Sequence, residues 1–197
     1  MEINLPNKLT IFRIMIVPIV VLLLSLDNLE YKYLYSGIFF LIASYTDHLD
    51  GQIARKNNIV TDFGKIMDPL ADKILVSSIF ICFVGLGLVP SLAAAIIVVR
   101  EFIVTSLRFL VLQGKGKVIS ANILGKLKTF TQIVSIMSIF VIQTYLEFSA
   151  KNNFAWTINQ NALYIFKDVL IWASVLFSCL SGASYIFLNR KFIVFSA

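Results

Sequence analysis

Charged residues are scarce in this chain. Asp, Glu, Lys and Arg together make up 14% of its 197 residues, whereas 58% of the residues are hydrophobic. A soluble domain carries about 25% charged and about 45–50% apolar residues. The composition therefore excludes a water-soluble globular domain and indicates an integral membrane protein, in agreement with a mean hydropathy of +0.86.

Cysteine and histidine are also nearly absent, with two Cys and one His. Cys82 and Cys179 lie in apolar runs far apart in the sequence, which predicts two buried small hydrophobic residues rather than a disulfide or a metal-binding pair. His48 is the single histidine, and on a helix it would point about 100° away from the neighbouring Asp47. We therefore interpret His48 as a bystander.

Acids are few as well, yet five of the 11 fall between residues 47 and 72, and four of these form two pairs in or beside otherwise membrane-like sequence. Asp47 and Asp50 are spaced i, i+3, and Asp68 and Asp72 are spaced i, i+4, so each pair lies on one face of a helix. A carboxylate inside a bilayer costs at least about 2.5–3.5 kcal/mol, which makes such residues candidates for function. Two pairs on two helices can form an all-oxygen site for hard divalent cations such as Mg²⁺.

Small and basic residues accompany these acids. Gly51 and Ala54 share the face of the first acidic pair and let a nucleotide, or a second helix, approach the backbone closely. Arg55 follows at the water interface, where a guanidinium can bind a phosphate with two hydrogen bonds. Gly64 is expected to begin the next helix, where its backbone N–H can approach a phosphate. Helix packing alone is the alternative reading of the small residues.

The whole stretch reads Asp-x-x-Asp-Gly-x-x-Ala-Arg, then eight residues, then Gly-x-x-x-Asp-x-x-x-Asp. This pattern resembles the signature of the CDP-alcohol phosphatidyltransferases, and no fixed position departs from it. Eight fixed positions over 26 residues are far more specific than a lone glycine motif. The matching residues are Asp47, Asp50, Gly51, Ala54, Arg55, Gly64, Asp68 and Asp72.

The resemblance implies a transferase that takes CDP-diacylglycerol from the membrane and releases CMP. It implies that one or two Mg²⁺ or Mn²⁺ ions are held by Asp47, Asp50, Asp68 and Asp72. It implies that the nucleotide and diphosphate of CDP-diacylglycerol are bound by Asp47, Gly51, Ala54, Arg55 and Gly64. Asp72, the last acid, would be the general base, and the protein would form a homodimer.

The acceptor alcohol is indicated by a second group of residues. Arg100, Glu101 and Arg108 lie within an apolar run, where Glu101 and Arg108 can pair to order the bundle, or the two arginines can collect the phosphate of an anionic substrate. Lys126 in G-K-L-K-T and the opening L-P-N-K-L-T-I-F-R resemble the phosphatidylglycerophosphate synthases of this family. That resemblance implies sn-glycerol 3-phosphate as the acceptor, with its phosphate on Arg100, Arg108 and Lys126.

Other functions stay open at this point. The same chemistry could use serine, inositol phosphate or phosphatidylglycerol as the acceptor. A divalent-cation transporter, from a different class of protein, would also contain acid pairs at membrane depth. Against it, the acids cluster at one end of the spans, and no polar path continues outward.

The apolar runs predict an all-α bundle of the CDP-alcohol phosphatidyltransferase type, in one domain over residues 1–197. Residues 1–8 are expected to form a short interfacial segment, with Thr10 near the mouth of the site and Arg13 extending to the lipid headgroups. Lys and Arg on alternate connections place both termini and the acids in the cytoplasm, in a bacterial plasma membrane. The six expected transmembrane helices cover about residues 9–26, 33–55, 64–87, 91–112, 126–148 and 163–188.

Overall fold

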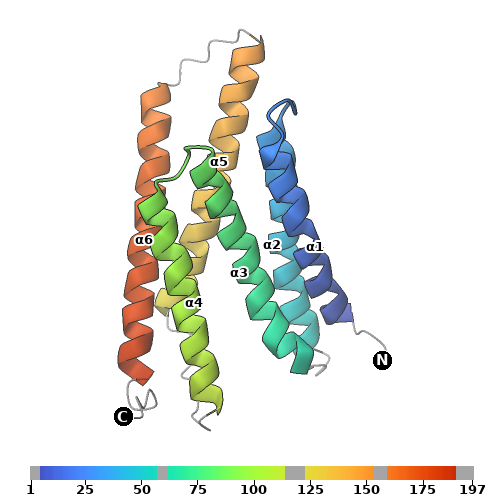
Figure 1. The fold of residues 1–197 in the computed structure, drawn as a ribbon, viewed down its shortest axis with the longest axis vertical. Helices are drawn as coiled ribbons and strands as arrows, with labels where there is room; N and C mark the ends of the chain where they lie inside the picture. The colour runs from blue at the N-terminus through green and yellow to red at the C-terminus, as the bar shows by residue number, and fades with distance from the viewer. Residues whose placement is uncertain (1–4, 57–61, 114–122, 153–158, 190–197) are drawn as a thin grey trace. The chain divides into compact units, whose positions relative to one another are not determined.

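The computed structural model describes residues 5–56, 62–113, 123–152 and 159–189, without the side chains of 5–6, 47–56, 62–63, 65–66 and 108–113. Within these ranges the chain forms six α-helices and no strand (Figure 1), so the predicted all-α fold is confirmed. The helices are α1 (Leu5–Ser25), α2 (Lys32–Lys56), α3 (Asp62–Gly85), α4 (Ser91–Gln113), α5 (Ile123–Asn152) and α6 (Gln160–Asn189).

The N-terminal segment differs from the prediction. Helix α1 begins at Leu5, so residues 5–8 belong to the first helix and not to a separate interfacial segment. Pro6 in the first turn does not prevent this, because the first backbone N–H groups of a helix have no intrahelical partner for a proline to remove. Residues 1–4 lie outside the described part of the chain.

Three of the described helices are long and apolar enough to cross a membrane, over Asn7–Ser25, Ile123–Asn152 and Gln160–Asn189. The other three helices also expose large apolar side chains, as in Tyr45 on α2 (63% exposed), Ile81 on α3 (60%) and Leu92 on α4 (63%). Apolar surface of this kind on every helix fits an integral membrane protein.

The chain divides into two compact units. The first holds residues 1–86 and 137–157, in which α1 packs against α2 and α3. Its core contains Phe40, Phe83 and Phe140, with ring centroids 6.0 Å apart for Phe40–Phe140 and 5.1 Å for Phe83–Phe140. Gly37 permits this packing, because a Cβ there would lie only 3.2 Å from the Cβ of Phe140.

The connection between α1 and α2 is attached to the end of α5 within the same unit. Tyr31 has a φ of 56° and donates its backbone N–H to Oε1 of Glu147 at 2.5 Å. Lys151 pairs with Glu30 at 2.6 Å, and its ammonium lies 5.0 Å from the centroid of the Tyr31 ring. These contacts hold the turn in a left-handed conformation that non-glycine residues seldom adopt.

The second unit holds residues 87–136 and 158–197, with α4 packed against α6. The Ser135 hydroxyl of α5 donates to the carbonyl of Leu170 on α6 at 2.8 Å. Lys167 on α6 donates to the carbonyl of Leu88 at 2.8 Å and so anchors the turn before α4. Both cysteines are free thiols, but Cys179 on α6 is exposed, so the predicted burial is wrong for that residue. An apolar thiol is compatible with a helix face that contacts lipid.

Candidate active site

The second acidic pair lies on α3, in the first compact unit. Asp68 and Asp72 are half-buried and one helical turn apart, so both carboxylates lie on one face of the helix, as predicted. Thr10, fully buried on α1, donates its hydroxyl to Oδ1 of Asp68 at 2.5 Å. Thr10 therefore lies beside an acid of the predicted site, and α1 supplies part of the environment of Asp68.

Arg13 lies one turn beyond Thr10 on α1 and is fully buried, with 0% of its surface exposed. The prediction that it extends to the lipid headgroups is therefore wrong. A guanidinium stays charged at any accessible pH, and a buried charge must be balanced within the protein. Arg13 thus brings positive charge into the unit that holds the acids.

The start of α3 has the features expected for binding an anion. Gly64 is buried in the first turn of the helix, which begins at Asp62. Backbone N–H groups at a helix N-terminus carry partial positive charge and favour phosphate. Lys73 does not extend away from the helix, since its ammonium donates to the carbonyl of Pro69 at 2.9 Å.

The first acidic pair belongs to the end of α2. Helix α2 continues unbroken to Lys56, so the predicted helical spacing of Asp47 and Asp50 is confirmed. The side chains of this end of the helix lie outside the described part of the structure, among them those of Asp47, Asp50, Ala54 and Arg55. Helix α2 packs against α3, so the two motif-bearing helices are neighbours.

Metal binding can be assessed for the half of the site whose side chains are described. Asp68 and Asp72 offer carboxylate oxygens one turn apart, and oxygen is the ligand that Mg²⁺ and Mn²⁺ prefer. The described side chains contain no group of three or more His, Cys, Asp and Glu residues able to hold a metal ion. The full predicted set needs Asp47 and Asp50 as well. Asp68 and Asp72 are suitable oxygen ligands for one half of that four-carboxylate site.

A buried ionic cluster occupies the second unit and involves the residues predicted to bind the acceptor. Glu101 on α4 is 4% exposed, and its Oε1 accepts from Nη1 of Arg100 at 3.2 Å and from Nε2 of Gln132 at 3.3 Å. The same oxygen forms an ion pair with Lys128 of α5. Nη2 of Arg100 donates to the hydroxyl of Ser181 on α6 at 2.9 Å.

The sequence alone did not identify Lys128, Gln132 or Ser181 as members of this cluster. The pairing of Glu101 with Arg108 is one of the two alternatives that the sequence left open, and the side chain of this arginine is not described. The described partners of Glu101 are other residues. Lys126, at the start of α5, is exposed. The spacing of Lys128 and Gln132, one turn apart on α5, was the available signal that both could reach one partner.

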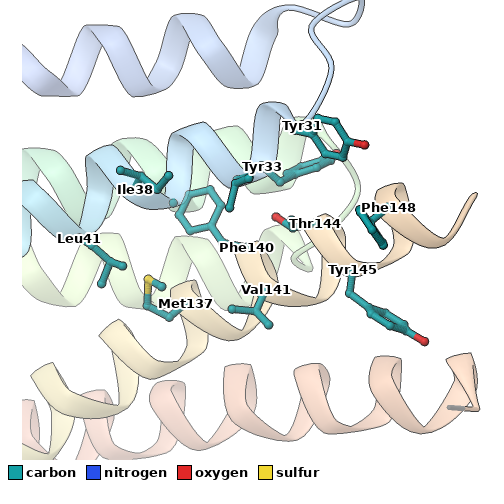
Figure 2. A pocket seen from close by; sticks show the side chains of 12 residues that line it. Tyr31, Tyr33, Ile38, Leu41, Met137, Phe140, Val141, Thr144, Tyr145 and Phe148 are labelled. Carbon is teal, nitrogen blue, oxygen red and sulfur yellow. The ribbon is translucent and has the colours of Figure 1, made fainter. Parts of the chain in front are cut away.

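An apolar groove of about 590 Å³ lies elsewhere in the first unit, between the start of α2 and the end of α5 (Figure 2). The side chains that line it are mostly aromatic and aliphatic, among them Tyr33, Leu41 and Phe140. The residues that line the groove include no Asp, Glu, His, Lys or Arg. The groove therefore offers none of the charged side chains that phosphoryl chemistry needs.

Comparison with known proteins agrees with the motif. Residues 3–180 match the model of the CDP-alcohol phosphatidyltransferase family. A protein of Bacillus subtilis (strain 168) named CDP-diacylglycerol–glycerol-3-phosphate 3-phosphatidyltransferase is 39% identical over 193 residues, which cover 92% of this chain and 93% of that protein. Proteins with the same name from Rickettsia typhi and Rickettsia felis are 37% and 35% identical, covering 92% and 96% of this chain and 94% and 97% of their own. The chain belongs to the CDP-alcohol phosphatidyltransferase family.

Proposed function

We propose that this protein transfers the phosphatidyl group from CDP-diacylglycerol to sn-glycerol 3-phosphate, giving phosphatidylglycerophosphate and CMP. The observation that carries the proposal is similarity over nearly the whole chain to relatives that share one name, at 35–39% identity. The complete acidic motif and the cationic cluster on α4 and α5 supply the two kinds of group that this reaction needs.

The donor is proposed to bind at the facing ends of α2 and α3. Arg55 and the N-terminal turn of α3 at Gly64 would hold the diphosphate, because a guanidinium and a helix N-terminus both favour phosphate oxygens. The bare face left by Gly51 and Ala54 would accommodate the cytidine. Asp47 would contact the nucleotide as well as serve as a metal ligand.

Asp72 is proposed as the general base. It would take the proton of the acceptor hydroxyl, whose oxygen then bonds to the phosphorus that carries the diacylglycerol oxygen. The bond from that phosphorus to the bridging oxygen of CMP breaks, and CMP leaves. Divalent ions held by Asp47, Asp50, Asp68 and Asp72 would supply polarisation of the diphosphate and stabilisation of the leaving group. The Thr10 hydroxyl fixes the orientation of Asp68 for this role.

The acceptor phosphate is proposed to lie on Arg100, Arg108 and Lys126. A guanidinium carries five N–H groups. In Arg100 the hydrogen bonds to Glu101 and Ser181 use one N–H of each terminal nitrogen. One N–H on each of these nitrogens is therefore left to donate to a phosphate. An uncharged acceptor would make little use of these cations, which supports glycerol 3-phosphate over inositol or serine.

We also propose six membrane-spanning helices, with both termini and the acids facing the cytoplasm of a bacterial plasma membrane. Exposed apolar side chains on all six described helices and the distribution of Lys and Arg support this topology. A homodimer remains a prediction from the family resemblance, as does the single domain. The transporter alternative loses its support, because the chain belongs to a family of transferases.

The test is release of CMP from CDP-diacylglycerol by the purified full-length protein, with glycerol 3-phosphate, serine, inositol phosphate or phosphatidylglycerol offered in turn. We expect CMP only with glycerol 3-phosphate and Mg²⁺ or Mn²⁺, and a loss of about 10²–10⁴-fold in Asp72→Asn. Asp168→Asn, which changes an exposed acid on α6, is the matched control and should keep activity. CMP release with a different alcohol alone would overturn the proposed acceptor, and none with any alcohol would overturn the proposal.

A further inference from the structure

We propose that Glu101 is a positioning residue for the acceptor phosphate, and that it holds Lys128 in place as a further cation of that site. This inference rests on the proposed function. Glu101 has partners on α5 that the sequence did not reveal, and Lys128 is the second lysine of G-K-L-K-T, to which the resemblance assigned no role. Both lie in the second compact unit, where all the contacts that carry the inference are described.

The geometry around Glu101 is the first argument. One carboxylate oxygen, Oε1, faces Arg100 from its own helix and both Lys128 and Gln132 from α5. Lys and Arg side chains are flexible, and a partner that fixes them removes freedom that a substrate would otherwise have to remove on binding. The Glu101 side chain is 4% exposed, so packing restricts its movement. Its carboxylate therefore holds a cation of α4 and a cation of α5 close to each other.

The burial of the cations is the second argument. The side chains of Arg100 and Lys128 are only 13% and 12% exposed. A charge that is largely removed from water attracts an opposite charge more strongly, because the local dielectric constant is low. The remaining exposure leaves the two cations within reach of a small anion from solvent, and a phosphate is the anion that the proposed reaction brings.

The direction of the side chains on α5 is the third argument. Lys126 and Lys128 are two residues apart, so they point about 200° apart around the helix. Lys128 is the one that reaches Glu101 and therefore lies with Arg100, whereas Lys126 is exposed. A phosphate bound to Arg100 would thus meet Lys128 directly, whereas Lys126 would have to reach it with its long, flexible side chain from the start of α5.

A purely structural role is the competing explanation, in which the cluster only fastens α4 to α5 and α6. The two roles differ in what a substitution changes. If the role is structural, a substitution lowers thermal stability and changes the KM values of both substrates equally. If the role is positioning, it raises the KM for glycerol 3-phosphate specifically. Glu147 is a suitable control. Its carboxylate also accepts a hydrogen bond, but it lies on the part of α5 that belongs to the first unit.

The experiment measures kcat and the KM of each substrate for Glu101→Gln, Glu101→Asp, Lys128→Met and Glu147→Gln in the full-length protein. We expect Glu101→Gln and Lys128→Met to raise the KM for glycerol 3-phosphate about 10- to 100-fold, as for loss of a hydrogen bond to a charged group, with little change for CDP-diacylglycerol. Glu101→Asp should restore part of the loss, and Glu147→Gln should leave both KM values near those of the wild type.

Equal changes in both KM values, or lower thermal stability with unchanged KM values, would overturn the inference while the proposed function stands. Lys128→Met keeps the Arg100–Glu101 pair balanced in charge, so it tests the inference even where Glu101→Gln does not fold. A wild-type protein that shows neither turnover with glycerol 3-phosphate nor a rise in Tm on its addition would overturn the proposed function and this inference with it.

Discussion

The hydroxyl of Thr10 donates to the carboxylate of Asp68 across the interface of α1 and α3, with Oγ1 and Oδ1 2.5 Å apart. Thr10 belongs to the opening L-P-N-K-L-T-I-F-R and Asp68 to the acidic motif, 58 residues further along the chain. The contact joins two segments that carry different parts of the family resemblance. It means that the first helix helps to orient an acid of the proposed metal site.

Replacement of Thr10 by Val should lower kcat/KM for CMP release by about 10- to 100-fold, because Asp68 loses a hydrogen bond to its charged oxygen. The Val side chain keeps the shape of Thr, so thermal stability should change less than activity. Thr10→Ser retains the hydroxyl and should stay near wild-type activity. Ser25→Ala removes a hydroxyl of the same helix that bonds only the carbonyl of Val21, and serves as the control. Equal activities for Thr10→Val and Ser25→Ala would contradict the role of the contact.

Replacement of Gly182 by Ala should disturb Arg100. A Cβ at this position of α6 would lie 3.1 Å from Nε and 3.2 Å from Cγ of Arg100, whose terminal nitrogens are already bonded to Glu101 and Ser181. We expect a raised KM for glycerol 3-phosphate, measured with CDP-diacylglycerol held at saturation. Gly85→Ala on α3 is the control, because nothing lies within 4 Å of its added Cβ. An unchanged KM in Gly182→Ala would show that Arg100 does not take part in acceptor binding.

Replacement of Gly37 by Ala should destabilise the first unit. The added Cβ would lie 3.2 Å from Cβ and 3.3 Å from Cγ of Phe140, a 2%-exposed side chain held between Phe40 and Phe83. Overpacking of this kind costs about 1–3 kcal/mol, partly offset by about 1 kcal/mol of helix propensity. Thermal unfolding in detergent measures the effect. In a Phe140→Leu background the cost should shrink, and an equal cost in both backgrounds would contradict the proposed clash.

Replacement of Lys167 by Met should lower stability without changing the KM of either substrate. Its buried ammonium is the donor to the carbonyl of Leu88 at 2.8 Å, and loss of a hydrogen bond to a charged group costs about 1.5–3 kcal/mol. Its ion pair with Asp168 spans 3.3 Å, and the acid is 53% exposed, so Asp168→Asn should cost less than about 1 kcal/mol. The Tm values of the two variants measure the two losses of stability. A larger drop in Tm for Asp168→Asn than for Lys167→Met would contradict the greater contribution of the hydrogen bond to Leu88.

Much of the fold follows from the sequence because apolar runs and their polar interruptions are local signals. Helix α4 begins at Ser91, as predicted, and the described helices occur in the predicted order. The acidic pairs could be placed on helices for the same reason, since i, i+3 and i, i+4 spacing decides which side chains share a face. The observed start at Leu5 precedes the predicted start near residue 9, because a proline at residue 6 is tolerated in the first turn of a helix.

The partners of charged residues could not be predicted in the same way. The spacing allows Glu101 to pair along its own helix with Arg108, whose side chain is not described, whereas the described contacts of Glu101 include Lys128 and Gln132 of α5. Arg13 was expected at the lipid surface and is buried. Both outcomes depend on which helix faces which, and this is decided by long-range packing rather than by spacing within one segment.

Transfer of a phosphatidyl group to glycerol 3-phosphate can be followed by the incorporation of radiolabelled glycerol 3-phosphate into lipid. The purified protein would be supplied with CDP-diacylglycerol and Mg²⁺, and the organic phase would be analysed for label and mass. We expect a labelled lipid with the mass of phosphatidylglycerophosphate, formed in equal amount to CMP and lost in Asp72→Asn. CMP release with no label in the lipid phase would show that glycerol 3-phosphate is not the acceptor.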